Sequence, residues 1–248
     1  MTVKDQLTTL SSYLLRPGKR KFIKTAYSLK NKYGLEIAGP STIFGLRGAF
    51  PVYLFCTSVD DVNYEDGKIW EKKDRGSDYA FYRDKKGKRI VADGDDLVSI
   101  NDNTYDFVLS SHSLEHMANP LKALKEWRRV LKPQGTLVLI LPDKRFTFDA
   151  KRPYTSFEHL LEDYRQNRQE NDETHLGEIL ETFPDNNINP TKEAYASILK
   201  DNFKYRCAHH HVFNENLLKE ALVFAGFDIG YQTTYPPFHL ITVATAKK

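Results

Sequence analysis

The alternation of apolar and polar stretches along the chain predicts strands and helices that follow one another. Apolar runs of the length expected for buried strands lie at 33–38, 105–111 and 136–141. A short strand is expected at 89–92, extended pieces between 52 and 64, and two last strands at 227–233 and 238–246. Pro236 and Pro237 predict a tight return between the last two strands, which therefore pair antiparallel.

Helices are predicted between these runs. Asn119 is a suitable N-cap and Pro120 suits the first helical position, while the apolar residues up to Leu131 mark one helical face. Asn214 is expected to cap a helix that ends near Gly226. Strands that alternate with helices indicate a doubly wound α/β fold with a mostly parallel sheet. Ligands of such folds bind beyond the carboxyl ends of the strands, where the strand order reverses.

Residues 143–206 differ from the rest because they are polar and aromatic and have no strand pattern. Thr155 and Glu158 have the spacing of a capping box. We therefore predict a helical insertion that covers the carboxyl ends of the strands before the C-terminal strands begin. The start of this insertion is expected to contact the substrate through Asp143, Lys144, Phe146, Phe148, Asp149, Arg152 and His159.

Composition narrows the class of protein. The 248 residues are expected to form a single domain with a basic, partly helical segment at 1–32 and a polar loop at 65–88. A formal charge of +3 is too small to indicate nucleic acid on its own. Two cysteines, Cys56 and Cys207, make no disulfide framework and favour a reducing cytoplasm. No apolar signal core and no run long enough to span a membrane is present.

Several motifs occur in a familiar order: EIAGPS, VDDVNY, ADGDDL, YDFVLSSHSLEHM and RVLKPQGTLVLILP. Together they resemble the class I S-adenosylmethionine-dependent methyltransferases over residues 33–142 and 207–248. The resemblance implies a seven-stranded Rossmann-like sheet whose last strand is antiparallel. One departure is that the loop after the first strand has lost a glycine of the family's Gly-x-Gly pattern and keeps Gly39.

The resemblance also implies roles for individual residues. Asp60 would accept hydrogen bonds from the ribose hydroxyls, with Asp61 and Asn63 as alternatives because the end of that strand is ambiguous. Asp93 would accept from the adenine amino group, and Gly94 would donate its backbone N–H. The methionine part of the cofactor would lie beside Glu36, Gly39, Pro40, Ser41, Ser110 and Ser111.

His112, Glu115 and His116 stand at positions i, i+3 and i+4, so a helical turn would put them on one face. Imidazole and carboxylate together suit Mn²⁺, Fe²⁺, Zn²⁺ or Mg²⁺. Small-RNA 2′-O-methyltransferases and ubiquinone-pathway O-methyltransferases resemble this turn with Glu-x-x-Glu-His, and by that resemblance His209, or else His211, supplies a further ligand. Leu-Glu-His also occurs in this superfamily without a metal, and His112 or His209 is then the candidate general base.

The acceptor is inferred from resemblance alone. The combination of GPS after the first strand and HSLEH after the fourth resembles bacterial methyltransferases of surface-polysaccharide and sugar biosynthesis. It implies O-methylation of a small anionic acceptor, such as a sugar or a nucleotide-linked sugar. RNA ribose 2′-O-methylation is a second hypothesis, weakened by the modest charge. A non-catalytic cofactor-binding scaffold is a third, motivated by the altered glycine loop.

Overall fold

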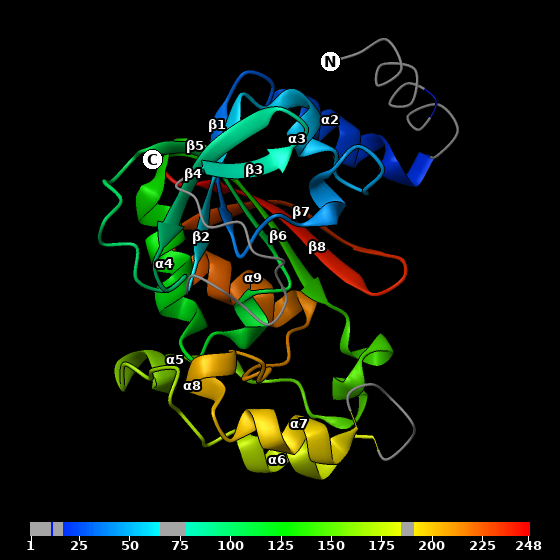
Figure 1. The fold of residues 1–248 in the computed structure, drawn as a ribbon, viewed down its shortest axis with the longest axis vertical. Coiled ribbons are helices and arrows are strands. Elements are labelled where there is room, and N and C mark those ends of the chain that lie inside the picture. The colour runs from blue at the N-terminus through cyan, green and yellow to red at the C-terminus, as the bar shows by residue number, and fades with distance from the viewer. Residues whose placement is uncertain (1–10, 12–16, 65–77, 185–190) are drawn as a thin grey trace.

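An eight-stranded sheet forms the centre of the computed structural model, which describes residues 11, 17–64, 78–184 and 191–248 (Figure 1). Its strands are β1 (Tyr33–Ile37), β2 (Ser58–Asn63), β3 (Asp78–Tyr82), β4 (Lys85–Val91), β5 (Tyr105–Ser111), β6 (Leu131–Pro142), β7 (Phe227–Tyr235) and β8 (His239–Ala246). They lie in the order β3-β4-β2-β1-β5-β6-β8-β7.

The sheet is parallel in its middle and antiparallel at both edges. Strands β4, β2, β1, β5 and β6 pair parallel, and β8 pairs antiparallel with both β6 and β7. The predicted α/β class and the antiparallel C-terminal pair are confirmed. The strand count is eight rather than seven because β3 pairs antiparallel with β4 within the region predicted as a polar loop. Tyr79 and Phe81 of this edge strand are buried, whereas Asp78 and Ala80 are exposed.

Helices cover both faces of the sheet (Figure 1). The longer ones are α2 (Arg20–Ser28), α4 (Pro120–Val130), α5 (Phe157–Arg165) and α9 (Glu215–Phe224), and the shorter ones are α3 (Val52–Phe55), α6 (Leu176–Thr182), α7 (Lys192–Leu199) and α8 (Asn202–Tyr205). Helices α4 and α9 share one apolar core with the sheet, and α2 and α3 share another on the opposite face. Val52–Phe55 was predicted to be extended but forms α3, whose four side chains are all buried.

The ends of the helices follow from capping residues. Asn119 Oδ1 accepts a hydrogen bond from the Lys122 amide at 3.1 Å, and Asn214 Oδ1 accepts one from the Leu217 amide at 2.9 Å, so both predicted caps are confirmed. The capping box at Thr155 was wrong by one residue. Ser156 caps α5 instead, because the Thr155 hydroxyl accepts the Val212 amide at 3.0 Å.

The predicted helical insertion is present between β6 and α9. It contains two 3₁₀ turns, η4 (Lys144–Phe146) and η5 (Phe148–Lys151), and the helices α5 to α8. These helices lie beyond the carboxyl ends of the central strands (Figure 1), and part of the insertion has an apolar cluster of its own built around Phe183 and Tyr195. Within the described ranges, no helix has the length and apolarity needed to cross a bilayer.

Candidate active site

A cavity of about 880 Å³ lies at the carboxyl ends of β1, β2, β4 and β5. The strand order reverses between β1 and β5, which is where open α/β sheets bind ligands. The loops that follow these strands line one side of the cavity, and residues of the insertion line the other. Its volume falls within the range of small-molecule and cofactor sites.

A buried glutamate, Glu36, accepts hydrogen bonds that hold the loop after β1 in place. The Glu36 carboxylate accepts hydrogen bonds from the Ser41 amide at 3.0 Å, the Tyr53 hydroxyl at 2.5 Å and the Tyr79 hydroxyl at 3.0 Å. Complete burial raises the pKa of Glu36 to about 7, although the bonds from Tyr53 and Ser41 act in the opposite direction. Glu36 and Ser41 therefore shape the loop, and neither is among the residues that line the cavity.

Gly39 lies at the tightest point of this loop. Its amide donates to Asp61 Oδ1 at 2.9 Å. A Cβ added to Gly39 would lie 2.3 Å from the Tyr79 hydroxyl oxygen and 2.5 Å from Glu36 Cδ, so any side chain would displace the loop. Gly39 and Pro40 both line the cavity, which leaves backbone exposed to a ligand there.

Asp60, for which the resemblance implies the ribose role, is not among the residues that line the cavity. Strand β2 continues to Asn63, so Asp60 lies in mid-strand, where it accepts from the Lys88 amide and the Tyr105 hydroxyl, each at 2.8 Å. The alternative Asp61 is fully buried under Gly39. Asn63 is the member of this set that lines the cavity, and its amide donates to Asp61 Oδ2 at 2.6 Å.

Asp93 and Gly94 follow β4 and both line the cavity. The Trp127 indole N–H donates to the Gly94 carbonyl at 2.8 Å and so ties this loop to α4. Asp93 forms an ion pair with Arg206 of the insertion, with Oδ1 and Nη2 3.0 Å apart. Burial raises the pKa of Asp93, and Arg206 opposes that shift.

The two serines at the end of β5 lie outside the residues that line the cavity. Ser110 is fully buried within the sheet, and Ser111 is the last residue of the strand. Ser113 takes their place in the lining, and its hydroxyl donates to the Ile37 carbonyl at 3.3 Å. The sequence pattern gave no reason to choose Ser113. His112 before it has a φ of 54°, a left-handed backbone conformation that the strand pattern does not predict.

The histidine turn is not an α-helix. His112 precedes a short 3₁₀ turn, η3 (Leu114–His116), so the expected helical face does not form. His112 lines the cavity, and its Nε2 lies 3.0 Å from His239 Nδ1. Its Nδ1 is 3.5 Å from Glu115 Oε1. His112 therefore lies beside the group formed by Glu115, His116 and His209 but is not one of its members.

Glu115, His116 and His209 place one potential ligand atom each within 4.8 Å of one another, and we call them the Glu115 cluster. Glu115 is 1% exposed, and neither carboxylate oxygen has a hydrogen-bond partner in the described part of the chain. Burial would raise the pKa of Glu115, yet the neighbouring histidines bring it below its usual value. Burial lowers the pKa of His116 to about 4, so this imidazole is neutral at neutral pH.

Buried polar groups hold both imidazoles of the Glu115 cluster through Nδ1. His116 Nδ1 lies 3.1 Å from the Ala208 carbonyl oxygen, and His209 Nδ1 lies 2.5 Å from Asp149 Oδ2. The buried Arg152 guanidinium donates to Asp149 Oδ1 at 2.8 Å and to the His209 carbonyl at 2.7 Å. With Nδ1 engaged, each ring has its Nε2 left for another partner, which is the arrangement seen in carboxylate–histidine–metal sites. The buried Glu115 carboxylate beside them makes no direct hydrogen bond with the residues that the structure describes, which fits a cation.

The start of the insertion contributes less to the cavity than expected. Phe148 lines it and packs on His209 with ring centroids 4.5 Å apart, whereas Asp149 and Arg152 orient that histidine. Arg206 and Tyr64 were not anticipated. The Arg206 guanidinium stacks on the Tyr64 ring, 3.8 Å from its centroid. The two residues come from segments that are distant in the sequence.

Comparison with known proteins agrees with this geometry. Residues 53–139 match the family model described as a methyltransferase domain. Over 117 residues, or 45% of this chain, the sequence is 32% identical to the probable methyltransferase ltbC of Aspergillus luteorubrus, of which the match spans 40%. The chain therefore contains a segment that matches a methyltransferase domain, and its fold is similar to that of S-adenosylmethionine-dependent methyltransferases of known structure.

Two solved structures of S-adenosylmethionine-dependent methyltransferases have a similar fold. A methyltransferase from Methanosarcina mazei has a TM-score of 0.51 at 15% identity, covering 91% of this chain and 97% of its own. One from Mesorhizobium loti has a TM-score of 0.50 at 13% identity, covering 92% and 96%. The chain spans about two fifths of the length of the Aspergillus methyltransferase it matches.

Proposed function

We propose that this protein transfers the methyl group of S-adenosylmethionine to a hydroxyl or phosphoryl oxygen of a small, polar, anionic sugar-type acceptor. One observation carries the proposal: a single cavity connects the Gly39 and Asp93 loops to His116 and His209. The loops have the chemistry to hold a nucleoside and an amino acid, and the histidines have the chemistry to act on an acceptor oxygen.

In the proposed reaction the acceptor oxygen attacks the methyl carbon as the carbon–sulfur bond breaks, which releases S-adenosylhomocysteine. The proton of an acceptor hydroxyl passes to His209 Nε2. Asp149 accepts the Nδ1 proton of the same ring at 2.5 Å and would stabilise the imidazolium that results. Most of the rate would come from alignment of the acceptor, the methyl group and the sulfur.

Glu115, His116 and His209 would hold a divalent cation, and such an ion would lower the pKa of an acceptor hydroxyl bound to it. His209 would then be a ligand rather than a base. The buried carboxylate of Glu115, which makes no direct hydrogen bond in the described part of the chain and has His112 Nδ1 at 3.5 Å, supports this form of the site. Dependence of turnover on added Mn²⁺, Mg²⁺ or Fe²⁺ after EDTA treatment separates the two forms.

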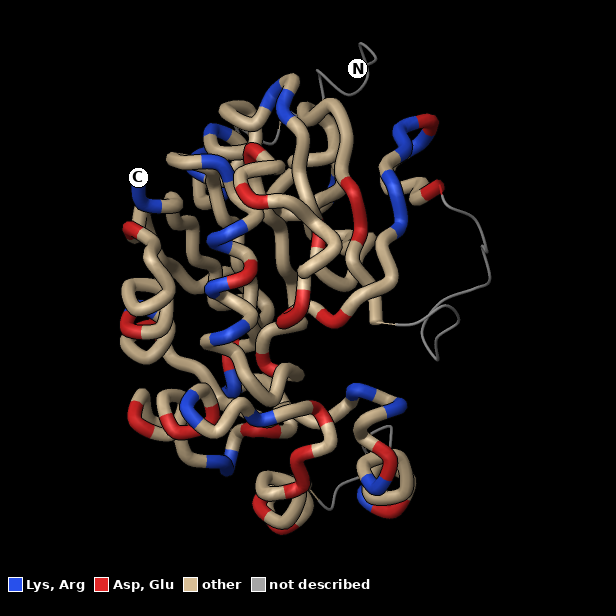
Figure 2. The backbone as a smooth tube through the Cα atoms, turned by 90° about the vertical axis from the view of Figure 1, so that its left-hand side faces the viewer, with Lys and Arg blue, Asp and Glu red and all other residues tan. Residues whose placement is uncertain are grey.

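An anionic acceptor would be met by Lys204 of the insertion, which lines the cavity, whereas Arg206 beside it already pairs with Asp93 and Glu170. In the view of Figure 2, basic and acidic residues are interspersed along the described chain and do not gather on one face. This distribution favours a small acceptor over a nucleic acid, whose backbone calls for a continuous basic surface.

The first experiment is calorimetric titration with S-adenosylhomocysteine in EDTA. Binding in the micromolar range, about −8 kcal/mol, is expected. Asp93→Ala should weaken it by about 10-fold or more. Asp102→Ala is the matched control, because Asp102 also pairs with an arginine, Arg129 at 2.7 Å, but is exposed and outside the cavity lining. Absence of binding by the wild-type protein would overturn the proposal and would also argue against a cofactor-binding scaffold, leaving a role without this cofactor.

The second experiment is a methyl-transfer screen with phosphorylated sugars, nucleotide sugars and a short RNA. His209→Ala should lower turnover about 10²–10⁴-fold without loss of S-adenosylhomocysteine binding. Methylation of the RNA alone, with strong inhibition by salt, would replace the sugar proposal with ribose methylation. Unchanged turnover in His209→Ala would remove the proposed base.

A further inference from the structure

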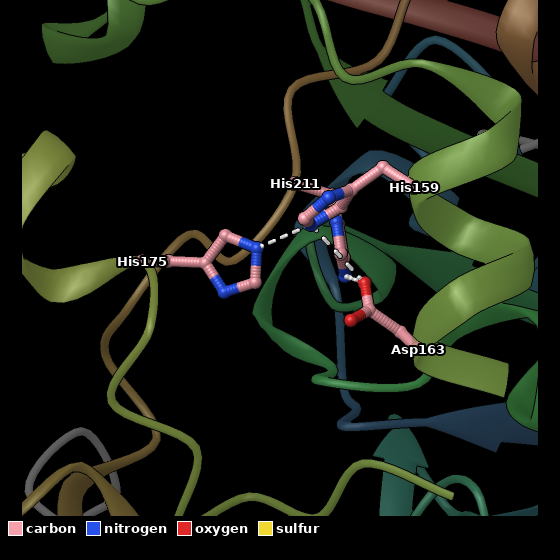
Figure 3. A group of neighbouring side chains, drawn as sticks. All are labelled: His159, Asp163, His175 and His211. Carbon is pink, nitrogen blue, oxygen red and sulfur yellow. Dashed lines mark hydrogen bonds and ion pairs between the residues drawn. The ribbon is translucent and has the colours of Figure 1, made fainter. Parts of the chain in front are cut away.

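A second group of metal-ligating side chains lies away from the cavity. His159 and Asp163 project from α5, His175 precedes α6, and His211 lies in the segment before α9 (Figure 3). One ligand atom from each of these four residues lies within 4.8 Å of all the others. Figure 3 shows the four side chains converging from three separate segments of the chain. None of the four lines the cavity described above.

The distances between the donor atoms are those of a tetrahedral site. His159 Nε2 is 2.8 Å from His175 Nε2 and 3.3 Å from Asp163 Oδ2. His211 Nε2 is 3.7 Å from the same Asp163 oxygen. Ligands about 2.0–2.1 Å from a tetrahedral Zn²⁺ are separated from one another by about 3.3 Å. The three measured distances bracket that value.

Burial of the ligands also points to a cation. The Asp163 side chain is 3% exposed, and its Oδ2 has no hydrogen-bond partner in the part of the chain that the structure describes. The His211 side chain is fully buried beside it. The His159 side chain is 45% exposed, which gives an ion a path from solvent. Buried carboxylate and imidazole groups that face one another in this way are usually satisfied by a charge between them.

A further acidic residue completes the arrangement. Asp172 Oδ2 lies 3.1 Å from His175 Nδ1, so its carboxylate can accept the Nδ1 proton while Nε2 faces the centre of the group. Histidines that ligate metals commonly donate their second nitrogen to a carboxylate in this way. The other grouping available, Asp172 with His175 and His210, is less suitable because the Asn202 side-chain nitrogen lies 3.1 Å from His210 Nε2.

We propose that His159, Asp163, His175 and His211 form a tetrahedral, structural Zn²⁺ site. Three imidazoles and one carboxylate favour zinc over Mg²⁺ or Ca²⁺, which prefer oxygen ligands. Four protein ligands leave no open position for a substrate, as in structural zinc centres. The ion would join α5 and the segment before α6 to a residue two positions from His209. It would therefore fix the insertion over the candidate active site.

The arrangement has an alternative without metal. One of the two imidazoles, His159 or His175, would donate an N–H to the other across 2.8 Å, and His211 Nε2 would donate to the Ala118 carbonyl at 3.3 Å. Zinc content of the purified full chain, measured by mass spectrometry, separates the two. His159→Ala and Asp163→Asn should each lose one equivalent of zinc relative to the wild type. Glu162→Ala is the matched control, because this exposed carboxylate next to Asp163 faces away from the site.

Further measurements distinguish a zinc ion at this site from one at the Glu115 cluster. Asp172→Asn should weaken zinc binding about 10–100-fold in a calorimetric titration, as expected for a residue that supports a ligand. His116→Ala disrupts the Glu115 cluster and should retain the equivalent that His159→Ala loses. X-ray absorption of the wild-type zinc form should show four N/O ligands at about 2.0–2.1 Å. A wild-type chain without zinc affinity, or a zinc equivalent lost with His116→Ala instead of His159→Ala, would overturn the proposal.

Discussion

Replacement of Glu36 by glutamine should change how the stability of the protein depends on pH. Glu36 is 0% exposed, and burial raises the pKa of its carboxyl group from 4.5 to about 7. In the unfolded chain this group loses its proton near pH 4.5, and in the folded chain near pH 7. Between these values the folded state binds one proton more than the unfolded state, so rising pH lowers the free energy of unfolding.

The size of the effect follows from the shift. About 2.5 pKa units at 1.36 kcal/mol each amount to roughly 3 kcal/mol lost between pH 4.5 and pH 7. Glutamine has nearly the same shape and does not titrate. The difference in unfolding free energy between Glu36→Gln and the wild type should therefore move by about 2.5 kcal/mol in favour of the variant from pH 5 to pH 8, because the unfolded wild-type chain has already lost most of this proton at pH 5. Any change in the unfolding free energy that the glutamine amide causes independently of pH is the same at pH 5 and pH 8. It therefore cancels when the two differences are subtracted.

Urea unfolding at pH 5 and pH 8 measures the effect, because the unfolding free energy falls linearly with denaturant. Glu158→Gln on α5 is the control, since this glutamate is exposed and should follow the wild type at both values. A Glu36→Gln difference that is the same at pH 5 and pH 8 would refute the argument. It would mean that the hydrogen bonds from Tyr53, Tyr79 and Ser41 stabilise the carboxylate enough to offset its burial.

Gly39→Ala should cost about 1–3 kcal/mol in thermal unfolding and weaken S-adenosylhomocysteine binding, because its Cβ would lie 2.3 Å from the Tyr79 hydroxyl oxygen. Gly177→Ala in α6 has open space around it and should be neutral or gain up to about 1 kcal/mol, and an equal loss in both variants would contradict the crowding argument. Asn119→Ala removes the cap of α4 and should cost about 1 kcal/mol in urea unfolding with ligand affinity unchanged. An unaltered unfolding midpoint would show that the Lys122 amide finds another partner.

Local sequence patterns were sufficient for most of the secondary structure. The run of Tyr105 to Ser111 is a strand with the predicted bounds, and Asn119 caps α4 as expected. Alternation of apolar and polar residues and the capping chemistry depend on neighbours within a few positions, so the sequence contains the information. The edge strand β3 was missed because its short aromatic run at 79–82 lies within the charged stretch 65–88, which was interpreted as a polar loop.

The candidate site likewise contains residues that the local sequence predicted and residues that it did not. Gly39, Asp93 and Gly94 line the cavity as expected, since each lies directly after the end of a strand. Asp60 was expected near the end of its strand, but β2 runs three residues further, to Asn63. Successive side chains of a strand point to opposite faces, so a small shift in the strand end changes which side chain faces a ligand. His112 was grouped with Glu115 and His116 on the assumption of a helix, whereas the backbone reverses at that residue.

The sequence by itself determined the α/β class, the order of the elements and the loops that line the cavity, because periodicity and caps are local properties. Only the tertiary structure decided which distant side chains meet. Asp149 reaches His209, Arg206 reaches Asp93, and His159 comes near His175 and His211. These contacts join residues tens of positions apart. Their formation depends on how the insertion packs against the sheet, and no short stretch of sequence encodes that packing.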